Sequence, residues 1–255
     1  MASAPLEARR ITTGLRLRLS RFAPISKVSW CRQARLADTD LLRYSAEMSP
    51  VLVPGCADAL LFDLGRVVID IDFQRVLAVW ADQAGCAPAD LAPRFVLDEV
   101  YLRHERGQLD DAAFFEALRD RLGIALTDAQ LLEGWNAIFV GEMPGIAPLL
   151  ARAARHLPLY ALSNTNAPHV MHFSREFAAI LGHFRSVFVS SEIGCRKPDP
   201  AAYDHVVATT GIAAARIVFF DDLAENIEAA RAHGLIGVQV RSSDDVAKAL
   251  DQLGL

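Results

Sequence analysis

Six residues of this sequence have side chains suited to phosphate chemistry, and each follows an apolar segment. An aspartate ends LLFD, a serine and an asparagine end LYALSN, a lysine stands in CRKPDP, and two aspartates end VFFDD. Carboxylates are the oxygen ligands that Mg²⁺ prefers, and an aspartate can attack phosphorus to form an aspartyl-phosphate. A hydroxyl and an amide can hydrogen-bond an anion, and a lysine can offset its charge. Phosphoryl transfer with Mg²⁺ is therefore predicted for Asp63, Ser163, Asn164, Lys197, Asp221 and Asp222.

These residues come from a regular alternation of predicted elements. Short apolar segments typical of buried strands are residues 57–63, 158–164, 186–191, 216–222 and 236–240. Helical segments fill the intervals at residues 145–156, 200–210, 224–233 and 244–253. Alternation of this kind predicts an α/β fold, a Rossmann-like parallel sheet sandwiched by helices. Because the strands of a parallel sheet end at one edge, the six side chains should meet there.

One interval is too long for a simple crossover between strands. Between the first two strands the sequence predicts four consecutive helices, at residues 73–85, 88–106, 110–123 and 127–140, with Asp110 and Thr127 as N-caps. We interpret residues 73–140 as an inserted helical cap, and residues 48–72 and 141–255 as the Rossmann-like core.

Residues 1–47 differ in composition from the rest of the chain. They hold nine of the 26 Lys and Arg residues but only four of the 31 Asp and Glu residues. We expect a basic extension without stable structure, with Met48 as an alternative start of the folded chain. The remaining residues are acidic overall, which argues against nucleic acid as a partner. No apolar stretch is long enough to span a membrane.

Four cysteines, Cys31, Cys56, Cys86 and Cys195, show neither paired nor metal-binding spacing. They are typical of free thiols in a reducing compartment, so we expect a cytoplasmic protein. We expect a small phosphorylated substrate as its partner, and a monomer or a homodimer.

The four motifs LLFDLG, LYALSN, CRKPDP and VFFDD together resemble those of the haloacid dehalogenase-like hydrolases, over residues 57–242. Within that family, the stretches HERGQ, LSNTN and FFDDLAENIEAA resemble the branch of bacterial α-D-glucose-1-phosphate phosphatases. The resemblance implies a Mg²⁺-dependent phosphatase acting on a small phosphorylated metabolite, such as glucose 1-phosphate or another sugar phosphate, through an aspartyl-phosphate intermediate.

The resemblance also implies roles for individual residues. Asp63 would be the nucleophile and a metal ligand, Gly65 would offer its main-chain carbonyl to the metal, and Asp222 would bind the metal directly with Asp221 supporting it. Most phosphatases of the family carry an aspartate at the position of Gly65 as general acid and base. The close relatives that the chain resembles also lack it.

For the phosphoryl group, the resemblance implies hydrogen bonds from Ser163 and Asn164, while Lys197 would orient the nucleophile and offset charge. In the cap, His104, Glu105 and Arg106 are candidates for substrate specificity. They could equally form a solvated helix end with weak ion pairs. His169, after SNTNAP, could contact substrate or cap a helix.

Two other functions stay open at this stage. A 2-haloacid dehalogenase, in which the aspartate attacks carbon, needs no metal, and the adjacent Asp221 and Asp222 argue against it because paired carboxylates fit a cation between them. A non-catalytic protein that binds phosphorylated metabolites would keep the pocket without turnover.

Overall fold

The computed structural model describes residues 51–255, and a five-stranded sheet forms their centre. The strands lie in the order β5-β4-β1-β6-β7, and every neighbouring pair is parallel. Their bounds are β1 Ala59–Phe62, β4 Leu159–Ser163, β5 Phe184–Val189, β6 Ile217–Asp221 and β7 Ile236–Gln239. The predicted α/β fold is confirmed. The expectation for residues 1–47 lies outside the described residues.

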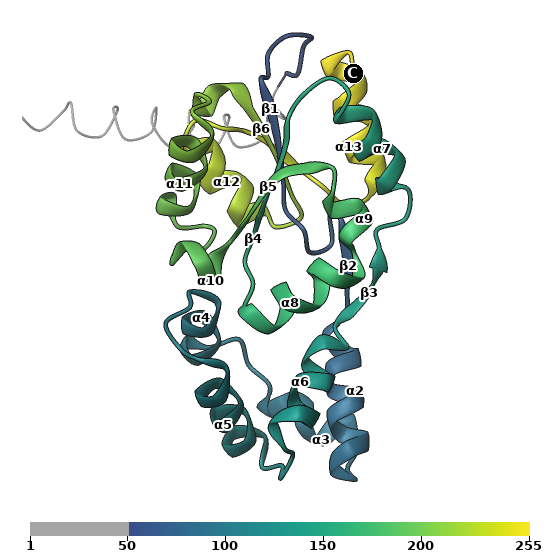
Figure 1. Cartoon of the computed structure of the whole chain (residues 1–255), viewed down its shortest axis with the longest axis vertical. Helices are drawn as coiled ribbons and strands as arrows, with labels where there is room; N and C mark the ends of the chain where they lie inside the picture. The colour runs from purple at the N-terminus through teal and green to yellow at the C-terminus, as the bar shows by residue number, and fades with distance from the viewer. Residues whose placement is uncertain (1–50) are drawn as a thin grey trace, which may run out of the picture. The chain divides into compact units, whose positions relative to one another are not determined.

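Helices cover both faces of this sheet, because successive side chains of a strand point to opposite faces. Leu60 and Phe62 of β1 pack with the layer of α7 and α13, whereas Ala59 and Leu61 pack with the layer of α11 and α12. The two layers lie on opposite sides of the strands in Figure 1. The bounds are α7 Ile146–Ala153, α11 Pro200–Thr210, α12 Ala224–Ala232 and α13 Ser243–Leu253.

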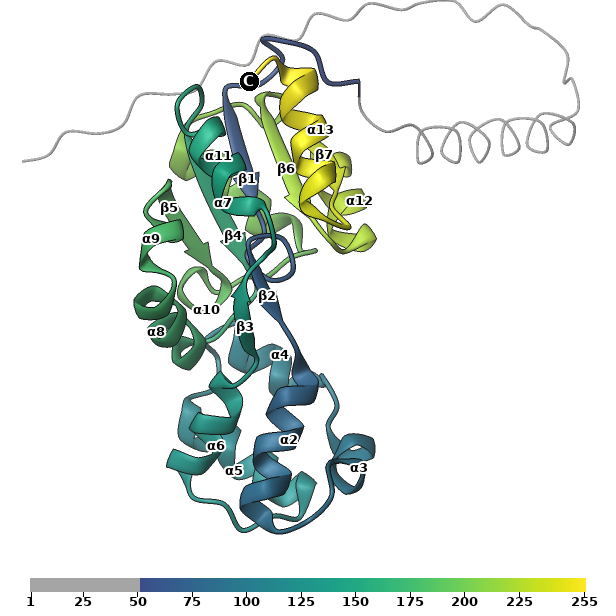
Figure 2. The ribbon, with the colours of Figure 1, turned by 90° about the vertical axis from the view of Figure 1, so that its right-hand side faces the viewer.

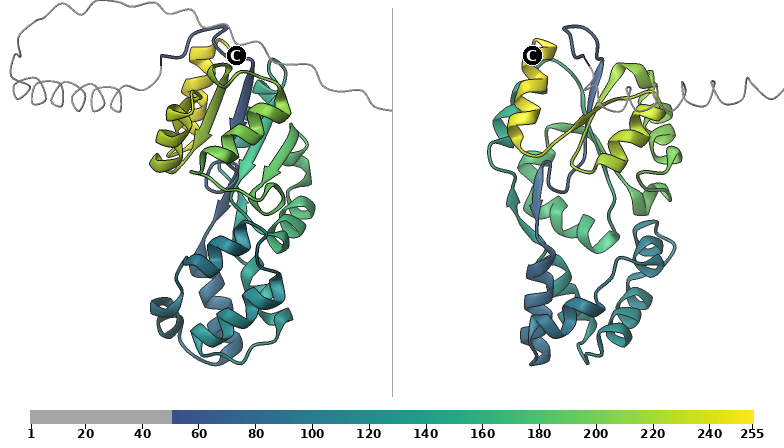
Figure 3. Two further views of the ribbon diagram at one scale, coloured as in Figure 1. Left: turned by 90° about the vertical axis from the view of Figure 1, so that its left-hand side faces the viewer. Right: turned by 180° about the vertical axis from the view of Figure 1, so that it is seen from behind.

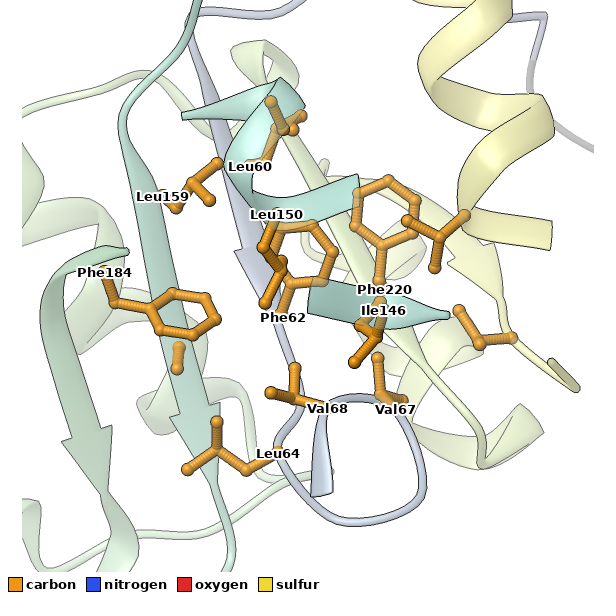
Figure 4. Packing of buried hydrophobic residues seen from close by; sticks show 14 of the residues in the cluster. Leu60, Phe62, Leu64, Val67, Val68, Ile146, Leu150, Leu159, Phe184 and Phe220 are labelled. Carbon is orange, nitrogen blue, oxygen red and sulfur yellow. The ribbon is translucent and has the colours of Figure 1, made fainter. Parts of the chain in front are cut away.

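Aromatic packing fixes β1 against its neighbour β6. The ring of Phe62 stacks on that of Phe220 with centroids 4.6 Å apart, and Ile146 and Leu150 of α7 lie over this pair in Figure 4. The same layer receives α8 and α9. The remaining core elements are α8 Ala167–Glu176, α9 Ala178–Leu181, α10 Ser190–Ile193 and the 3₁₀ turn η2 Ala214–Arg216.

A two-stranded antiparallel ribbon, β2 Ile69–Ile71 and β3 Phe139–Glu142, leads from the sheet to a separate group of helices, which we call the cap. Figure 2 shows both strands side by side between the sheet and these helices. The cap elements are α2 Phe73–Ala84, α3 Pro88–Leu91, the 3₁₀ turn η1 Ala92–Arg94, α4 Glu99–Glu105, α5 Asp111–Leu122 and α6 Asp128–Asn136.

The cap has a hydrophobic core of its own, centred on two tryptophans. Trp80 and Trp135 are fully buried and stack with centroids 6.0 Å apart. Gly134 permits this approach, since a Cβ at that position would lie 2.2 Å from the Trp80 ring. Trp80 also donates from Nε1 to the carbonyl of Leu131 over 3.0 Å. The cap therefore buries apolar surface that the sheet does not cover.

Two predicted cap helices are wrong in extent. The helix expected over residues 88–106 is interrupted, with Pro93 in a 3₁₀ turn and an extended segment before α4. The helix expected over residues 127–140 ends at Asn136, because the chain then pairs with β2. The predicted N-caps Asp110 and Thr127 are confirmed by hydrogen bonds to main-chain N–H groups.

The topology places the sequence motifs at one edge. β1 lies between β4 and β6, and the order of the strands reverses at this point, so their carboxyl ends meet where ligands bind in such sheets. That edge faces the cap in both views of Figure 3. Among the described residues, no helix has the length and apolar character needed to cross a bilayer.

Candidate active site

Three carboxylates converge at the carboxyl edge of the sheet. Asp63 follows β1, Asp221 ends β6, and Asp222 is the next residue. One oxygen atom of each lies within 4.8 Å of the others. Asp221 is fully buried and Asp63 nearly so, while Asp222 is half-buried. Like charges held this close need a cation, so the donor set fits a hard ion such as Mg²⁺.

A buried lysine partly neutralises these carboxylates. Lys197 is 1% exposed, and its Nζ lies 2.8 Å from Oδ1 of Asp63 and 2.7 Å from Oδ2 of Asp221. Burial by itself would lower the pKa of Lys197, but the charges of Asp221 and Asp63 outweigh it and raise that pKa. The lysine therefore stays charged and bridges the two aspartates.

Asn164 holds this lysine through the main chain. Its Nδ2 donates to the carbonyl of Lys197, and its Oδ1 accepts from the Lys197 N–H, each over 2.8 Å. The resemblance implied a hydrogen bond from Asn164 to the phosphoryl group. Asn164 lines the cavity, and both polar atoms of its side chain also bond to the main chain of Lys197, so this role stays a prediction. Ser163, 6% exposed, lines the cavity beside it and keeps the role expected of it as a prediction.

The two adjacent aspartates have different surroundings. The carboxylate of Asp221 accepts from Lys197, from Nδ2 of Asn226 and from the N–H of Leu223. Asp222 instead has the exposed Arg66 as a neighbour, with Nε 3.8 Å from Oδ2. Because the oxygens of Asp221 are already occupied, Asp222 has the freer oxygens for a metal.

Desolvation dominates the protonation of the nucleophile candidate. Burial raises the pKa of Asp63 to about 7, against the attraction of Lys197 and with added repulsion from Asp221 and Asp222. Burial and the charge of Asp221 also raise the pKa of Asp222. A bound divalent cation would favour the ionised forms of both groups.

Gly65 lies where a second aspartate would stand in a longer motif. A Cβ built on Gly65 would lie 3.2 Å from Cδ1 of Ile71, so apolar side-chain atoms occupy this side of the site. The following residue, Arg66, has a φ of 59°, the left-handed region that the tight loop after β1 requires. The loop thus turns immediately after Asp63 and exposes the Gly65 backbone to the cavity.

A cavity of about 350 Å³ opens between this edge and the cap. Of the three cap candidates, only Glu105 lines it. His104 is buried in the cap, where its ring stacks on Phe114 at 4.0 Å and its Nε2 lies 2.9 Å from Asp111. Arg106 pairs with Glu99 on the cap surface, at 3.6 Å. Arg106 therefore forms the weak ion pair at the helix end that was the alternative to a role in specificity, and His104 belongs to the cap core.

Glu105 connects the cap to the loop that carries Lys197. Its Oε1 accepts from the hydroxyl of Tyr101, and its Oε2 lies against Nε of Arg196, both over 2.8 Å. Sequence analysis did not single out Tyr101 or Arg196. The available signals were the position of Tyr101 one helical turn before Glu105 and of Arg196 directly before Lys197.

His169 also lines the cavity but is fully engaged. Its Nε2 lies 3.1 Å from the carbonyl of Trp135, and its Nδ1 lies 3.2 Å from Nδ2 of Asn166. Burial lowers its pKa to about 3. With both nitrogens bonded and the ring neutral, His169 is unsuited to donate a proton at neutral pH.

Comparison with known proteins agrees with this geometry. The sequence pattern of the haloacid dehalogenase-like hydrolases matches residues 57–234. The chain belongs to this family, and it is an enzyme of the hydrolase class. The family predicted from the four motifs is confirmed, whereas the finer resemblance to glucose-1-phosphate phosphatases stays a prediction.

The chain is similar to several proteins whose names state an activity or a bound ligand. Over 197 residues, the chain is 26% identical to a D-ribitol-5-phosphate phosphatase from Bacteroides thetaiotaomicron, covering 73% of this chain and 93% of that protein. A solved HAD family enzyme from the same organism, in complex with magnesium and inorganic phosphate, superposes with a TM-score of 0.65 at 25% identity, covering 73% of this chain and 95% of that one. An L-2-haloacid dehalogenase from Xanthobacter autotrophicus has a TM-score of 0.57 at 20% identity, covering 75% and 81%, and shares the fold.

Proposed function

We propose that this protein is a Mg²⁺-dependent phosphatase that hydrolyses small phosphate monoesters through an aspartyl-phosphate on Asp63. The observation that carries the proposal is the buried Lys197 ammonium, 2.8 Å from Oδ1 of Asp63 and beside a cluster of three carboxylates. The names of the relatives support it, since they include a phosphatase of a sugar-alcohol phosphate and an enzyme that binds magnesium and phosphate.

Asp63, Asp222 and the main-chain carbonyl of Gly65 would hold the metal, with Asp221 as a supporting residue. This assignment follows from the hydrogen bonds that already occupy Asp221. When bound, Mg²⁺ offsets the negative charge of the phosphoryl oxygens.

The remaining chemistry belongs to side chains of the chain itself. Oδ1 of Asp63 accepts hydrogen bonds from Lys197 and from the N–H of Leu64 over 2.7 Å. One carboxylate oxygen of Asp63 would form the new bond to phosphorus while the bond to the leaving oxygen breaks, and the other would face the metal. Water then attacks the aspartyl-phosphate, restoring Asp63 and releasing inorganic phosphate. Lys197 keeps the aspartate oriented, and Ser163 would hydrogen-bond the transferred group.

No side chain at position 65 can protonate the leaving oxygen. A general acid typically contributes about 10²- to 10⁴-fold, so esters with good leaving groups should react best. The anomeric oxygen of glucose 1-phosphate is a better leaving group than the primary oxygen of glucose 6-phosphate, because the ring oxygen withdraws electrons. Glucose 1-phosphate is thus the sugar phosphate that the sequence resemblance and this reasoning favour.

A panel of phosphate monoesters and 2-haloacids, assayed with Mg²⁺ and with EDTA, tests the proposal. We expect phosphate release that requires Mg²⁺. Halide release without a metal would instead support a 2-haloacid dehalogenase, and binding of phosphate esters without turnover would support a non-catalytic protein. The three carboxylates facing one buried lysine argue against the dehalogenase.

A further inference from the structure

The two ends of the cavity differ in chemistry. The end at the sheet is lined by Asp63, Asp222, Lys197 and Ser163. A leaving group would lie at the opposite end, which is lined by side chains from the ribbon, the cap and the loop after β6. The lining side chains there that are not buried are mainly apolar: Ile71, Phe73, Leu97, Phe139 and Leu223. Leu97 and Leu223 remain 52% and 46% exposed. Such side chains gain by contact with an apolar ligand.

The polar groups at the leaving-group end largely satisfy one another. Glu105 is 2% exposed and pairs with Arg196, so the two charges cancel within the wall. The Tyr101 hydroxyl donates to the same carboxylate. Both ring nitrogens of His169 are bonded to cap and core neighbours. Arg66, the exposed charged residue of the lining, lies beside Asp222 at the sheet end, with its Nε 3.8 Å from Oδ2. At the leaving-group end, a second charge or several hydroxyl groups on a substrate would therefore find few free partners.

We propose that this site prefers phosphate monoesters whose leaving group is an uncharged, largely apolar aryl group over those of polyhydroxylated sugars. The inference rests on the proposed phosphatase function and narrows its substrate class. A hydroxyl group that is buried against apolar side chains without a hydrogen-bond partner weakens binding, because it loses its hydrogen bonds to water. Each buried methylene group strengthens binding, because apolar surface is removed from water. Gly65 gives independent support for the aryl esters, because a phenol leaves without the acid that the site lacks.

The first experiment varies apolar area at constant leaving-group chemistry. The substrates are 4-methyl-, 4-ethyl- and 4-propylphenyl phosphate, whose phenols have similar acidity, together with glucose 1-phosphate. We expect kcat/KM to rise about two- to fourfold per added methylene. Leu97→Ser should flatten this rise. The matched control is Val96→Ser, since Val96 is 49% exposed, adjacent, and outside the cavity lining.

The second experiment removes the neutralising charge in the wall. Glu105→Gln keeps an acceptor for Tyr101 but leaves Arg196 without its carboxylate. The ratio of kcat/KM for 4-carboxyphenyl phosphate to that for its uncharged methyl ester should rise about tenfold, the effect of one charged hydrogen bond. Glu99→Gln is the matched control, since Glu99 lies on the same helix and pairs with Arg106 on the surface.

The outcomes separate the two levels of inference. A rise along the alkyl series that Leu97→Ser flattens supports the apolar preference. If glucose 1-phosphate has the highest kcat/KM, or if the alkyl series is flat, the preference is wrong while the phosphatase function stands. If no ester releases phosphate in a Mg²⁺-dependent reaction, the proposed function itself fails. Should Glu105→Gln not fold, the Leu97→Ser comparison still decides.

Discussion

Restoring a carboxylic acid at position 65 should change how the rate depends on the leaving group. In Gly65→Asp, an acid would stand two residues after the nucleophile and could protonate the leaving oxygen. We expect kcat/KM to gain most on primary alkyl phosphates, by up to about 10²- to 10⁴-fold, and little on aryl phosphates, whose phenols leave without help. The plot of log kcat/KM against leaving-group pKa, steep in the natural protein, should become shallow.

The structure indicates how to build this variant. Gly65 does not have a positive φ, so a side chain is compatible with the backbone, and the one tight contact is Cδ1 of Ile71 at 3.2 Å. Ile71→Val deletes that atom and typically costs about 0.5–1.5 kcal/mol in a core. The double variant Gly65→Asp/Ile71→Val, compared with Ile71→Val alone, therefore isolates the acid from the steric effect. Saturating Mg²⁺ is required, because a further carboxylate joins a cluster of three.

Gly65→Asn in the same background is the matched control, since it has the same shape and no acidic proton. The assay is kcat/KM, or a single-turnover rate, across a series of leaving groups, because slow hydrolysis of the aspartyl-phosphate could hide the first step in kcat. Equal behaviour of the Asp and Asn variants, or a shallow dependence in the natural protein, would refute the reasoning and would require an acid elsewhere in the cavity.

Three further predictions concern the nucleophile, the metal and the response to pH. Asp63→Asn should abolish turnover, to below about 1% of the natural rate, at an unchanged melting temperature, since it removes the attacking oxygen; substantial residual activity would show that water attacks directly. Asp222→Ala should weaken Mg²⁺ activation, measured by titration, whereas Asp221→Ala should mainly lower the melting temperature, because it removes one of the two carboxylates that pair with the buried Lys197 and the acceptor of the Asn226 amide; equal Mg²⁺ affinities in both variants would contradict the assignment. Because burial lowers the pKa of His169 to about 3, the unfolded chain binds a proton at this residue below about pH 6.5 and the folded chain does not, so the contribution of His169 to the free energy of unfolding should fall by about 2 kcal/mol between pH 6.5 and 5. His169→Gln should remove that part of the slope in denaturant unfolding, while the exposed His156→Gln should not, and an unchanged slope in the first variant would argue against a neutral buried ring.

Much of the fold and the catalytic edge could be predicted from the sequence because local patterns carry that information. Apolar runs such as LLFD and VFFDD form strands that are buried on both faces, and parallel strands bring the residues that follow them to one edge. The approach of Asp63, Asp221 and Asp222 follows from this rule. The bounds of core helices could be predicted in the same way, because α11 and α13 each begin after a capping residue and end at a glycine.

Other features depended on contacts between distant residues. The end of α6 at Asn136 is decided by pairing of β3 with β2, because a strand partner about 70 residues away outweighs local helical propensity. The motif SN predicted two residues that bind the phosphoryl group. The sequence did not show that the Asn164 side chain also bonds to the main chain of Lys197, because that contact joins segments 33 residues apart.

The cap shows the same division for the substrate end of the site. The sequence identified a polar segment at residues 104–106, but it did not show which of these three side chains faces the substrate. Only tertiary packing decided their positions. His104 lies in the cap core, Arg106 lies at the surface, and Glu105 pairs with Arg196 in the loop that carries Lys197. The sequence by itself predicted the carboxylates and the lysine at one edge, because parallel strands all end there. The tertiary structure decided which side chains line the opposite end of the cavity, because that wall is assembled from four separate stretches of chain.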